Sequence, residues 1–355
     1  MGEQLTRRTV LRAAMLAGLT TGIPAGADDK MLTRAIPATD EALPVVGLGT
    51  YSVFDVAGTP EELAARRDIV NALLDAGGSV IDSSPMYNRS EKVVGDVLAQ
   101  SGNRSRCFLA TKVWTTGRDA GERQMRQSAE LMQTRQIDLM QVHNRRDTAA
   151  HWPVIQEAQQ SGFIRYNGVT DYRESAAGAM QEIMRRYRPQ FIQINYSLGE
   201  RGADEAVLPM AQDNGIAVLI NRPFMAGSLF RAVGDRPLPG WTREFADSWG
   251  QFFLKFIVSH PAVTCVIPAT SKVRHMVDNA GAGFGPLPDQ KTRQRMVDFI
   301  RSVEAGGAPL LGSSSAFLRR NHSSPSGSSD RSSPSLILPA MGAGSASSNE
   351  EEHDD

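Results

Sequence analysis

The sequence predicts an eight-stranded parallel β/α barrel, the TIM barrel fold, over residues 38–305. Eight short apolar runs alternate there with helix-like segments. The runs are almost continuously apolar, as expected of parallel strands that are covered on both faces. Eight strand–helix units in roughly 270 residues also agree with the usual size of such a barrel, about 250 residues.

The expected strands are the eight apolar runs, and the expected helices are the amphipathic segments between them. We predict strands at Val45–Tyr51, Val80–Ser83, Cys107–Lys112, Ile137–His143, Ile164–Thr170, Phe191–Tyr196, Ile216–Ile220 and Val263–Pro268. After the first helix, described below, we predict helices at Ser90–Gln100, Gly121–Gln136, Trp152–Ser161, Glu174–Tyr187, Asp204–Asn214, Thr242–Ser259 and Lys272–Ala280. A last helix-like stretch, Asp289–Val303, follows the eighth unit and is expected outside the ring.

The first helix has the clearest limits. Thr59, Pro60 and Glu62 suit the N-cap, first and third helical positions, which is a capping-box arrangement. Apolar residues then recur at helical spacing until Gly77 and Gly78 end the helix.

A doubly wound α/β sheet is the alternative fold for alternating strands and helices. That fold binds dinucleotides through a G-x-G-x-x-G turn after its first strand. Here Gly47 and Gly49 form a shorter pattern that does not lead into a helix. We therefore favour the barrel.

Charge and cysteine content exclude several classes of function. A formal net charge of −1 over 355 residues gives no electrostatic reason to expect a nucleic-acid partner. Cys107 and Cys265 fall in strand-like runs on different sides of the barrel, so we expect buried, inert thiols and no disulfide. No Cys/His spacing resembles a zinc site, and no metal is expected.

Residues 1–27 read as an export signal. Arg7 and Arg8 precede a mild apolar stretch, and Ala25-Gly26-Ala27 provides an A-x-A cleavage site. The pattern resembles a twin-arginine signal, which implies export to the periplasm through the matching machinery. An ordinary export signal and a retained anchor are the alternatives. The apolar stretch is shorter than the ~20 residues that a spanning helix needs, so no stable membrane span is expected.

Residues 306–355 are rich in Ser, Gly and Pro and end in EEEHDD. They lack apolar periodicity, and we predict a disordered acidic tail.

Four polar residues stand where predicted strands end. Asp82 closes the second strand, Lys112 the third and His143 the fourth, while Tyr87 lies in the loop after Asp82. Because the carboxyl ends of barrel strands converge on one mouth, we expect these side chains to meet. A lysine at a buried strand end costs several kcal/mol unless it is paired, and Asp82 is its natural partner.

These four residue types suit proton donation to a carbonyl oxygen. A tyrosine has a pKa near 10, and a neighbouring ammonium lowers it, so that Tyr87 becomes a better acid. Tyr87 can then protonate a developing alkoxide, with His143 as a second donor to the same oxygen. A structural ion pair and a core histidine are the alternative readings of Lys112 and His143, but four such positions in order favour a site.

In these residues and in the motifs around them, the chain closely resembles the aldo/keto reductase superfamily from Leu43 to Asp289. The matching motifs are VVGLGTY, GGSVIDSSPMYNRSEKVVGDVL, FLATKVW, IDLMQVHN, GFIRYNGVTDY, FIQINYSL and VIPATSKVRHMVDN. The family's catalytic Asp–Tyr–Lys–His tetrad falls on Asp82, Tyr87, Lys112 and His143. The resemblance implies a β/α barrel and metal-free hydride transfer between a nicotinamide cofactor and a carbonyl.

The resemblance also implies the residues that bind the cofactor. They are Thr50, Tyr51, Asp82, Thr170, Asp171, Gln193, Asn221, Pro223, Phe224, Thr270, Ser271, Lys272, Arg274, Asp278 and Asn279. Two positions depart from the family pattern. Asp171 replaces the usual Asn and cannot donate a hydrogen bond to the carboxamide. Asn221 replaces an aromatic residue that stacks on the nicotinamide in many members, so stacking is either lost or supplied by Phe224.

The segment around Thr270 resembles the family's adenosine-phosphate site. Some members carry a Lys-Ser pair and a downstream Arg there, whereas this chain has Ala269, Thr270 and His275 with Lys272 and Arg274 displaced. Thr270, Ser271 and these two cations can still hold a 2′-phosphate. NADP(H) is therefore favoured, with NAD(H) as the alternative.

The leading interpretation is an oxidoreductase that reduces an aldehyde or ketone, or oxidises the alcohol. Tyr51 and Trp114 are expected to line the substrate pocket, with ordinary apolar packing as the alternative. A cofactor-binding redox sensor or regulatory subunit on the same barrel is the competing function, against which the intact tetrad argues. A sugar isomerase or hydrolase would need metal ligands or paired catalytic carboxylates, and neither is evident.

Overall fold

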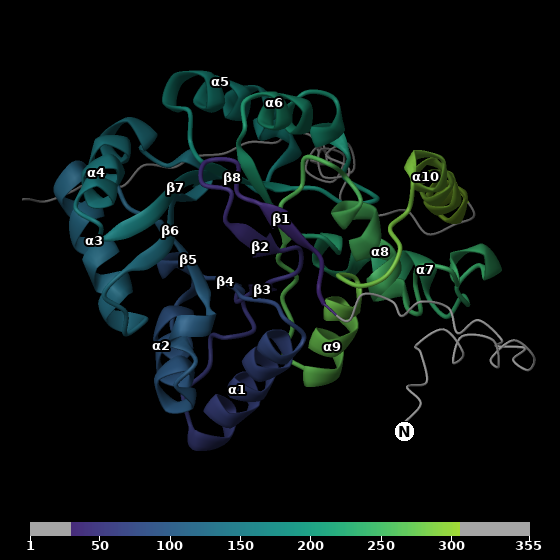
Figure 1. Cartoon of the computed structure of the whole chain (residues 1–355), viewed down its shortest axis with the longest axis horizontal. Helices are drawn as coiled ribbons and strands as arrows, with labels where there is room; N and C mark the ends of the chain where they lie inside the picture. The colour runs from purple at the N-terminus through teal and green to yellow at the C-terminus, as the bar shows by residue number, and fades with distance from the viewer. Residues whose placement is uncertain (1–29, 306–355) are drawn as a thin grey trace, which may run out of the picture. The chain divides into compact units, whose positions relative to one another are not determined.

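The barrel predicted from the sequence is confirmed. The computed structural model describes residues 30–305. Eight parallel strands form one sheet in the order β10-β9-β8-β7-β6-β5-β4-β3. Isolated bridges between Val46 and Val266 and between Gly49 and Ala269 join the two edges, so the sheet closes (Figure 1). The predicted export signal and acidic tail lie outside the described residues.

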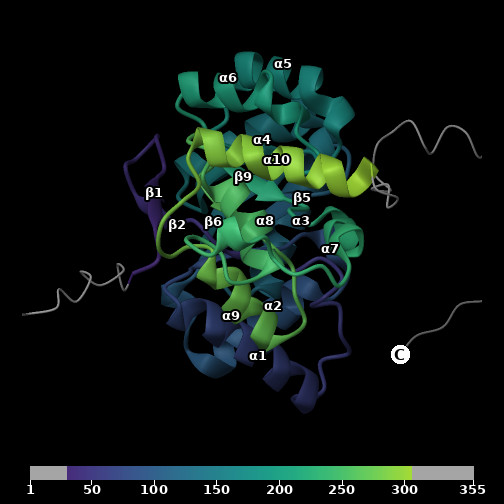
Figure 2. The same ribbon diagram turned by 90° about the vertical axis from the view of Figure 1, so that its right-hand side faces the viewer.

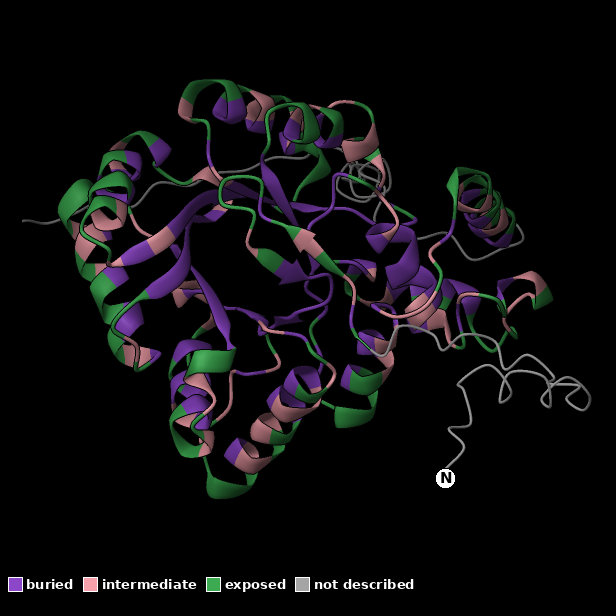
Figure 3. Ribbon diagram, in the orientation of Figure 1, coloured by how far each residue is buried: buried purple, intermediate pink, exposed green. Residues whose placement is uncertain are grey.

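Each barrel strand lies inside its predicted run or within one residue of it. The strands are β3 (Leu48–Gly49), β4 (Val80–Asp82), β5 (Phe108–Val113), β6 (Ile137–Val142), β7 (Ile164–Thr170), β8 (Phe191–Asn195), β9 (Ala217–Asn221) and β10 (Cys265–Val266). They are buried almost throughout (Figure 3), which is why their sequences are so uniformly apolar.

Helices surround the strands, with buried inner faces and exposed outer faces (Figure 3). They are α1 (Pro60–Asp75), α2 (Ser90–Ser101), α3 (Arg118–Leu131), α4 (Thr148–Gln160), α5 (Ala177–Tyr187), α6 (Val207–Asp213), α7 (Ser228–Val233), α8 (Trp249–Val258) and α9 (Val273–Gly281). The predicted capping box of α1 is confirmed. Thr59 Oγ1 accepts the Glu62 N–H at 3.3 Å, and Glu62 Oε2 accepts the Thr59 N–H at 3.1 Å. No helix of residues 30–305 is long and apolar enough to cross a membrane.

The predicted limits of three helices are wrong. The helix predicted from Trp152 begins at Thr148 instead. The segment predicted at Gly121–Gln136 begins at Arg118 and ends at Leu131, because Gly117 (φ 83°) and Gln133 (φ 50°) turn the backbone on either side. The helix predicted from Thr242 begins at Trp249 instead.

Ser248 caps this shorter helix, α8, since its Oγ accepts the Gln251 N–H at 3.0 Å. The short helix α7 lies between predicted elements, where the sequence analysis predicts no helix. The helix expected after the eighth unit is confirmed as α10 (Gln290–Ala305), which packs outside the ring beside α7 (Figure 2).

A hairpin that the sequence analysis missed closes the amino-terminal end of the barrel. Strands β1 (Thr33–Ala35) and β2 (Ala42–Pro44) pair antiparallel. Ile36 and Leu43 of this hairpin are buried in the same apolar cluster as Val80, Phe108 and Phe191, which begin β4, β5 and β8. The opposite, carboxyl-terminal end is therefore the end available for chemistry.

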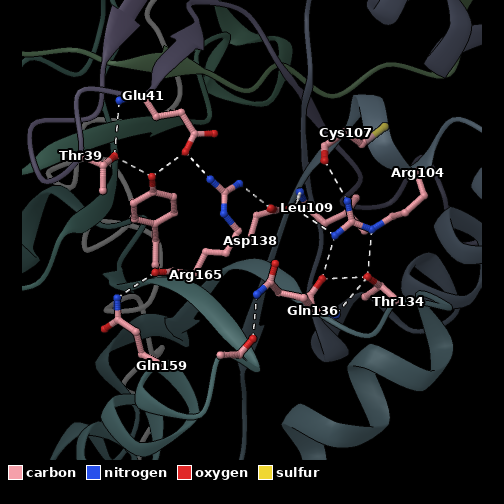
Figure 4. A network of polar contacts seen from close by, with 12 residues as sticks. Thr39, Glu41, Arg104, Cys107, Leu109, Thr134, Gln136, Asp138, Gln159 and Arg165 are labelled. Carbon is pink, nitrogen blue, oxygen red and sulfur yellow. Dashed lines mark hydrogen bonds and ion pairs between the residues drawn. The ribbon is translucent and has the colours of Figure 1, made fainter.

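Charged side chains join the hairpin to the amino-terminal end of the barrel, which we call the floor (Figure 4). Asp138 Oδ1 accepts from Arg165 at 2.8 Å, and Asp138 Oδ2 accepts from Arg104 at 3.1 Å and from the Leu109 N–H at 2.8 Å. Arg165 also pairs with Glu41 of the hairpin. Asp138 is thus the shared acceptor of a network that spans β5, β6, β7 and the hairpin.

Asp138→Ala is expected to lower the free energy of unfolding by about 2–4 kcal/mol. Two guanidinium groups each lose one of their acceptors and a buried N–H loses its acceptor, although exposed fractions of 31% and 34% for Arg104 and Arg165 soften the loss. Urea unfolding measures the change. Lys92→Ala, which breaks an exposed ion pair with Asp96, is the control and should change the same free energy by about 0.5 kcal/mol or less. Equal effects of the two variants would refute a stabilising role for the network.

Candidate active site

The structure brings the four predicted tetrad residues together at the carboxyl end of the barrel. Asp82 is the last residue of β4, Lys112 lies one residue before the end of β5, and His143 directly follows β6. Tyr87 ends a 3-10 turn, Pro85–Tyr87, that follows β4. Because β4, β5 and β6 are parallel neighbours, their ends share one edge of the sheet.

Lys112 and Asp82 form a buried ion pair. Lys112 Nζ lies 2.6 Å from Asp82 Oδ2 and also donates to the Ser83 carbonyl at 2.7 Å. Burial by itself lowers the pKa of Lys112, but the nearby Asp82 and Tyr87 outweigh burial and raise that pKa above its ordinary value. Lys112 is therefore charged at neutral pH.

Tyr87 lies beside this ammonium at the mouth. Lys112 Nζ is 4.9 Å from the centroid of the Tyr87 ring. Burial raises the pKa of Tyr87 more than the Lys112 charge lowers it, so the pKa lies above its ordinary value. The sequence-based expectation of a lowered pKa is wrong for the chain without a ligand. The direction of the Lys112 effect is as expected, but desolvation exceeds it.

His143 is neutral and has a defined partner. Burial, assisted by the Lys112 charge, lowers the pKa of His143 to about 3. Ser84 Oγ lies 2.8 Å from His143 Nδ1 and already accepts the Met86 N–H at 3.2 Å. The Ser84 hydroxyl hydrogen is thus available to Nδ1, and we assign the imidazole hydrogen to Nε2, on the far side of the ring. That arrangement makes His143 a neutral hydrogen-bond donor.

Amide side chains complete the polar layer across the barrel. Gln193 Nε2 donates to Asp82 Oδ1 at 2.8 Å, and Gln141 Nε2 reaches the same oxygen at 3.2 Å. Asn221 Nδ2 lies 3.4 Å from Gln193 Oε1. Asn221 Oδ1 is buried and has no hydrogen-bond partner among the described residues.

Asp171 is held by two arginines. Its carboxylate accepts from Arg145 Nε at 2.8 Å and from Arg173 at 2.7 Å, and it also accepts the Arg173 backbone N–H at 2.9 Å. Burial raises the pKa of Asp171, but these hydrogen bonds outweigh burial and leave the pKa below its ordinary value. Asp171 is therefore ionised and occupied by donors. The neighbouring Thr170 is buried where β7 pairs with Gln193 of β8.

Residues after β3 divide between the core and the mouth. Thr50 is buried, and its Oγ1 donates to the Asp82 carbonyl at 3.0 Å and lies 2.9 Å from Ser83 Oγ, so it supports the end of β4. Tyr51 is 58% exposed, and its ring lies 5.1 Å from that of Tyr87. Trp114 lies on the opposite side, with its ring 5.0 Å from His143. Tyr51 and Trp114 therefore each lie against one member of the tetrad, and their role as pocket residues stays a prediction.

Phe224 does not lie free over the mouth. Its ring packs 4.9 Å from that of Phe230 and 6.4 Å from that of Phe253, within an aromatic group between α7 and α8. Phe224 is half-buried and packs against the core, and its stacking on a nicotinamide stays a prediction. Pro223 is buried beside it.

The predicted adenosine-phosphate residues lie at the start of α9. Ser271, Lys272 and Arg274 are exposed, and buried Thr270 Oγ1 accepts the Lys272 N–H at 3.1 Å. Asp278 accepts from Ser248 and Gln251, at 2.8 and 3.1 Å, and thereby joins α9 to α8. The next residue, Asn279, is buried. Within the described residues, the two exposed cations at the start of this helix, Lys272 and Arg274, are therefore free to bind an anionic group.

The two cysteines and the acidic residues make no further centre in the part of the chain that the structure describes. Cys107 and Cys265 are buried and free, and burial raises the pKa of Cys107 to about 11. No group of three or more His, Cys, Asp or Glu side chains within residues 30–305 is placed to hold a metal ion.

Comparison with known proteins agrees with the barrel fold. The model of the aldo/keto reductase family matches residues 45–295. The aldo-keto reductase YhdN of Bacillus subtilis is 30% identical over 213 residues, which cover 53% of this chain and 59% of YhdN. The methylglyoxal reductase YeaE of Escherichia coli is 28% identical over 253 residues, which cover 68% of this chain and 86% of YeaE. The crystal structure of an aldo-keto reductase from Klebsiella pneumoniae in complex with NADPH has a TM-score of 0.64 at 24% identity, covering 76% of this chain and 96% of that one.

The barrel and the match over most of its length define an oxidoreductase that reduces carbonyl compounds with NAD(P)H. The chain belongs to the aldo/keto reductase family.

Three residues near the tetrad escaped the sequence analysis. Ser84 partners His143, and Gln141 helps to hold Asp82. Glu91 is buried, burial raises its pKa, and Thr111 Oγ1 donates to it at 2.5 Å. A polar residue inside an apolar run is the signal that would have found Gln141. No local signal distinguishes Ser84 from its neighbour Ser83.

Proposed function

We propose that this chain reduces an aldehyde or ketone with NADPH and that Tyr87 donates the proton to the carbonyl oxygen. The observation that carries the proposal is the position of Tyr87. It stands at the mouth between the charged Lys112, 4.9 Å from its ring, and the neutral His143, whose ring lies 5.8 Å away. No other phenol or acid among the described residues has such a setting.

The four residues divide the work of one proton transfer. The Lys112 ammonium stabilises the phenolate that Tyr87 becomes after it has donated. Asp82 holds Lys112 in place, and His143 Nε2–H donates to the same carbonyl oxygen and orients it. A bound nicotinamide cofactor supplies the hydride. Because His143 titrates near pH 3, its donor role is independent of pH in the physiological range.

The polar residues beside Gln193 fit the carboxamide of a nicotinamide. That group needs an acceptor for its N–H and a donor for its oxygen. Asn221 Oδ1 is a buried acceptor without a partner, and buried polar atoms are normally satisfied. Gln193 and Asn221 also carry amide donors. Asn221 therefore suits the carboxamide through hydrogen bonds rather than through the ring stacking common in the family.

The names of the relatives support a small carbonyl substrate and do not decide between NADPH and NADH as cofactor. Two of them are named methylglyoxal reductases, and one of these, the NADH-specific enzyme of Escherichia coli, is 26% identical over 241 residues. We propose NADPH as the preferred cofactor because Lys272 and Arg274 stand exposed at the start of α9.

Fluorescence titration with NADPH and NADH, followed by an aldehyde panel that includes methylglyoxal, tests the proposal. We expect binding of NADPH and turnover of at least one aldehyde. Tight cofactor binding without turnover of any member would favour a redox sensor on the same barrel instead.

Lys272→Ala and Arg274→Ala, alone and together, are expected to weaken NADPH more than NADH. Each loses one charge-assisted contact to the 2′-phosphate, worth roughly ten- to hundredfold in Kd. Lys291→Ala, an equal loss of charge on α10, is the control and should leave both Kd values unchanged. Equal weakening of both cofactors would show that the 2′-phosphate is bound elsewhere.

We also propose that the protein is exported to the periplasm by the twin-arginine route. Support comes from the sequence of residues 1–27 alone, with Arg7 and Arg8 ahead of the apolar stretch. Arg7→Lys with Arg8→Lys should leave the protein in the cytoplasm when cell fractions are immunoblotted. Unchanged export of this variant would contradict the route.

A further inference from the structure

An arginine lies over the tryptophan that borders the tetrad. Arg146 Cζ is 4.7 Å from the centroid of the Trp114 ring, and that ring lies 5.0 Å from the ring of His143. The guanidinium therefore stands one ring away from the residue that orients the carbonyl. Trp114 is half-buried and forms the wall between them.

The loop that carries Arg146 is held in place. Asn144, Arg145 and Asp147 have positive φ angles of 51°, 58° and 51°, which non-glycine residues adopt only when the surroundings impose them. Asp147 Oδ2 accepts the Gly117 N–H at 2.7 Å and ties this loop to the one after β5, which also carries Trp114.

A second contact joins helix α4, which follows the Arg146 loop, to the loop after β5, since His151 Nε2 lies 3.0 Å from the Thr115 carbonyl oxygen. The Arg146 backbone N–H donates to the His143 carbonyl at 3.0 Å. These contacts hold the backbone of the Arg146 loop beside the site of proton transfer.

Arg146 is the arginine in this loop whose charge is not neutralised within residues 30–305. Its neighbour Arg145 is paired with Asp171, as is Arg173. Arg146 is exposed and makes no side-chain hydrogen bond or ion pair with a described residue. Stacking of this exposed guanidinium on the indole is worth about 0.5–1 kcal/mol and does not satisfy the five N–H donors of the guanidinium.

We propose that Arg146 binds a carboxylate of the carbonyl substrate, so that the enzyme prefers aldehydes or ketones that carry a carboxylate. This inference rests on the proposed function. A single free guanidinium matches one negative charge and the two oxygens of a carboxylate. A phosphate dianion would call for a second free cation beside Arg146, and its neighbour Arg145 is already paired with Asp171. Arg146 acts on binding and selectivity, while Tyr87 and His143 act on the reacting oxygen.

Matched substrates separate this role from packing. The probes are 3- and 4-formylbenzoate and their methyl esters, which share the ring and the aldehyde and differ in charge. The ester group withdraws electrons more strongly, so intrinsic reactivity favours the esters. With NADPH, the unaltered enzyme is expected to prefer at least one carboxylate over its ester by roughly tenfold in kcat/KM, mainly through KM. The preference should shrink as salt concentration rises.

Arg146→Gln is expected to abolish the preference for the carboxylate over its ester, and Arg146→Lys is expected to retain part of this preference. Arg118→Gln removes a nearby exposed arginine that pairs with Glu157, and should leave the ratio unchanged. If Arg146→Gln lowers kcat/KM equally for carboxylates and esters, or if the unaltered enzyme shows no preference, the inference is wrong. Failure of the unaltered enzyme to reduce any aldehyde would overturn the proposed function as well, which distinguishes the two failures.

Discussion

Replacing Tyr87 with phenylalanine is expected to slow aldehyde reduction by roughly 10²–10⁴-fold while NADPH binds almost normally. The substitution removes only the hydroxyl. The ring keeps its edge contacts with Tyr51 and His143, at 5.1 and 5.8 Å, so the packing of the mouth is retained. The loss corresponds to about 3–5 kcal/mol of transition-state stabilisation. Steady-state kinetics with parallel fluorescence titration of cofactor measures both quantities.

The pH dependence of the unaltered enzyme provides a second test of the role of Tyr87 as proton donor. A general acid works only while protonated, and burial raises the pKa of Tyr87 above its ordinary value of 10. Aldehyde reduction should therefore not decline through titration of Tyr87 between about pH 6 and 9. Tyr87→Phe with nearly normal turnover would reduce Tyr87 to a packing residue and remove the basis of the mechanism.

Lys112→Met is expected to damage both folding and turnover. It leaves the Asp82 carboxylate buried without its cation, and loss of one partner of a buried pair typically costs about 3–5 kcal/mol of unfolding free energy. It also removes the charge that stabilises the Tyr87 phenolate, so turnover should fall by roughly 10²-fold or more.

A double variant separates the two effects of Lys112. Asp82→Asn combined with Lys112→Met removes both charges. The free energy of unfolding of the double variant should therefore be higher than that of Lys112→Met and close to that of the unaltered enzyme. Turnover should remain low, because the ammonium beside Tyr87 is still missing. Recovery of turnover along with stability would mean that Lys112 serves only to neutralise Asp82. Urea unfolding and single-turnover kinetics on the same preparations decide between these results.

The sequence predicted the barrel and the grouping of the tetrad because both depend on local patterns. Buried parallel strands are apolar on both faces, and a polar residue such as Lys112 or His143 at the end of such a run stands out. The ends of parallel strands must then meet at one edge, so the grouping follows from topology. The capping box of Thr59 and Glu62 is equally local.

Features that depend on packing between distant segments escaped prediction. The three-residue strands of the β1–β2 hairpin are too short for any periodicity to appear. Phe224 turns toward Phe230 and Phe253 because an apolar cluster lies there, which its own sequence position does not reveal. The raised pKa of Tyr87 reflects desolvation, a property of the whole fold around it.

The hairpin and its Asp138 network have a consequence for the independence of the two barrel ends. They stabilise the amino-terminal end, whereas Tyr87 and Lys112 occupy the carboxyl-terminal end, and the apolar barrel interior lies between them. Sites without shared partners contribute almost additively to free energy. Thermodynamic coupling between the floor and the mouth is therefore weak. Substitutions at the amino-terminal end can change the lifetime and heat tolerance of the protein without changing the active site. Substitutions at the carboxyl-terminal end can change which carbonyl compounds are reduced without changing stability elsewhere.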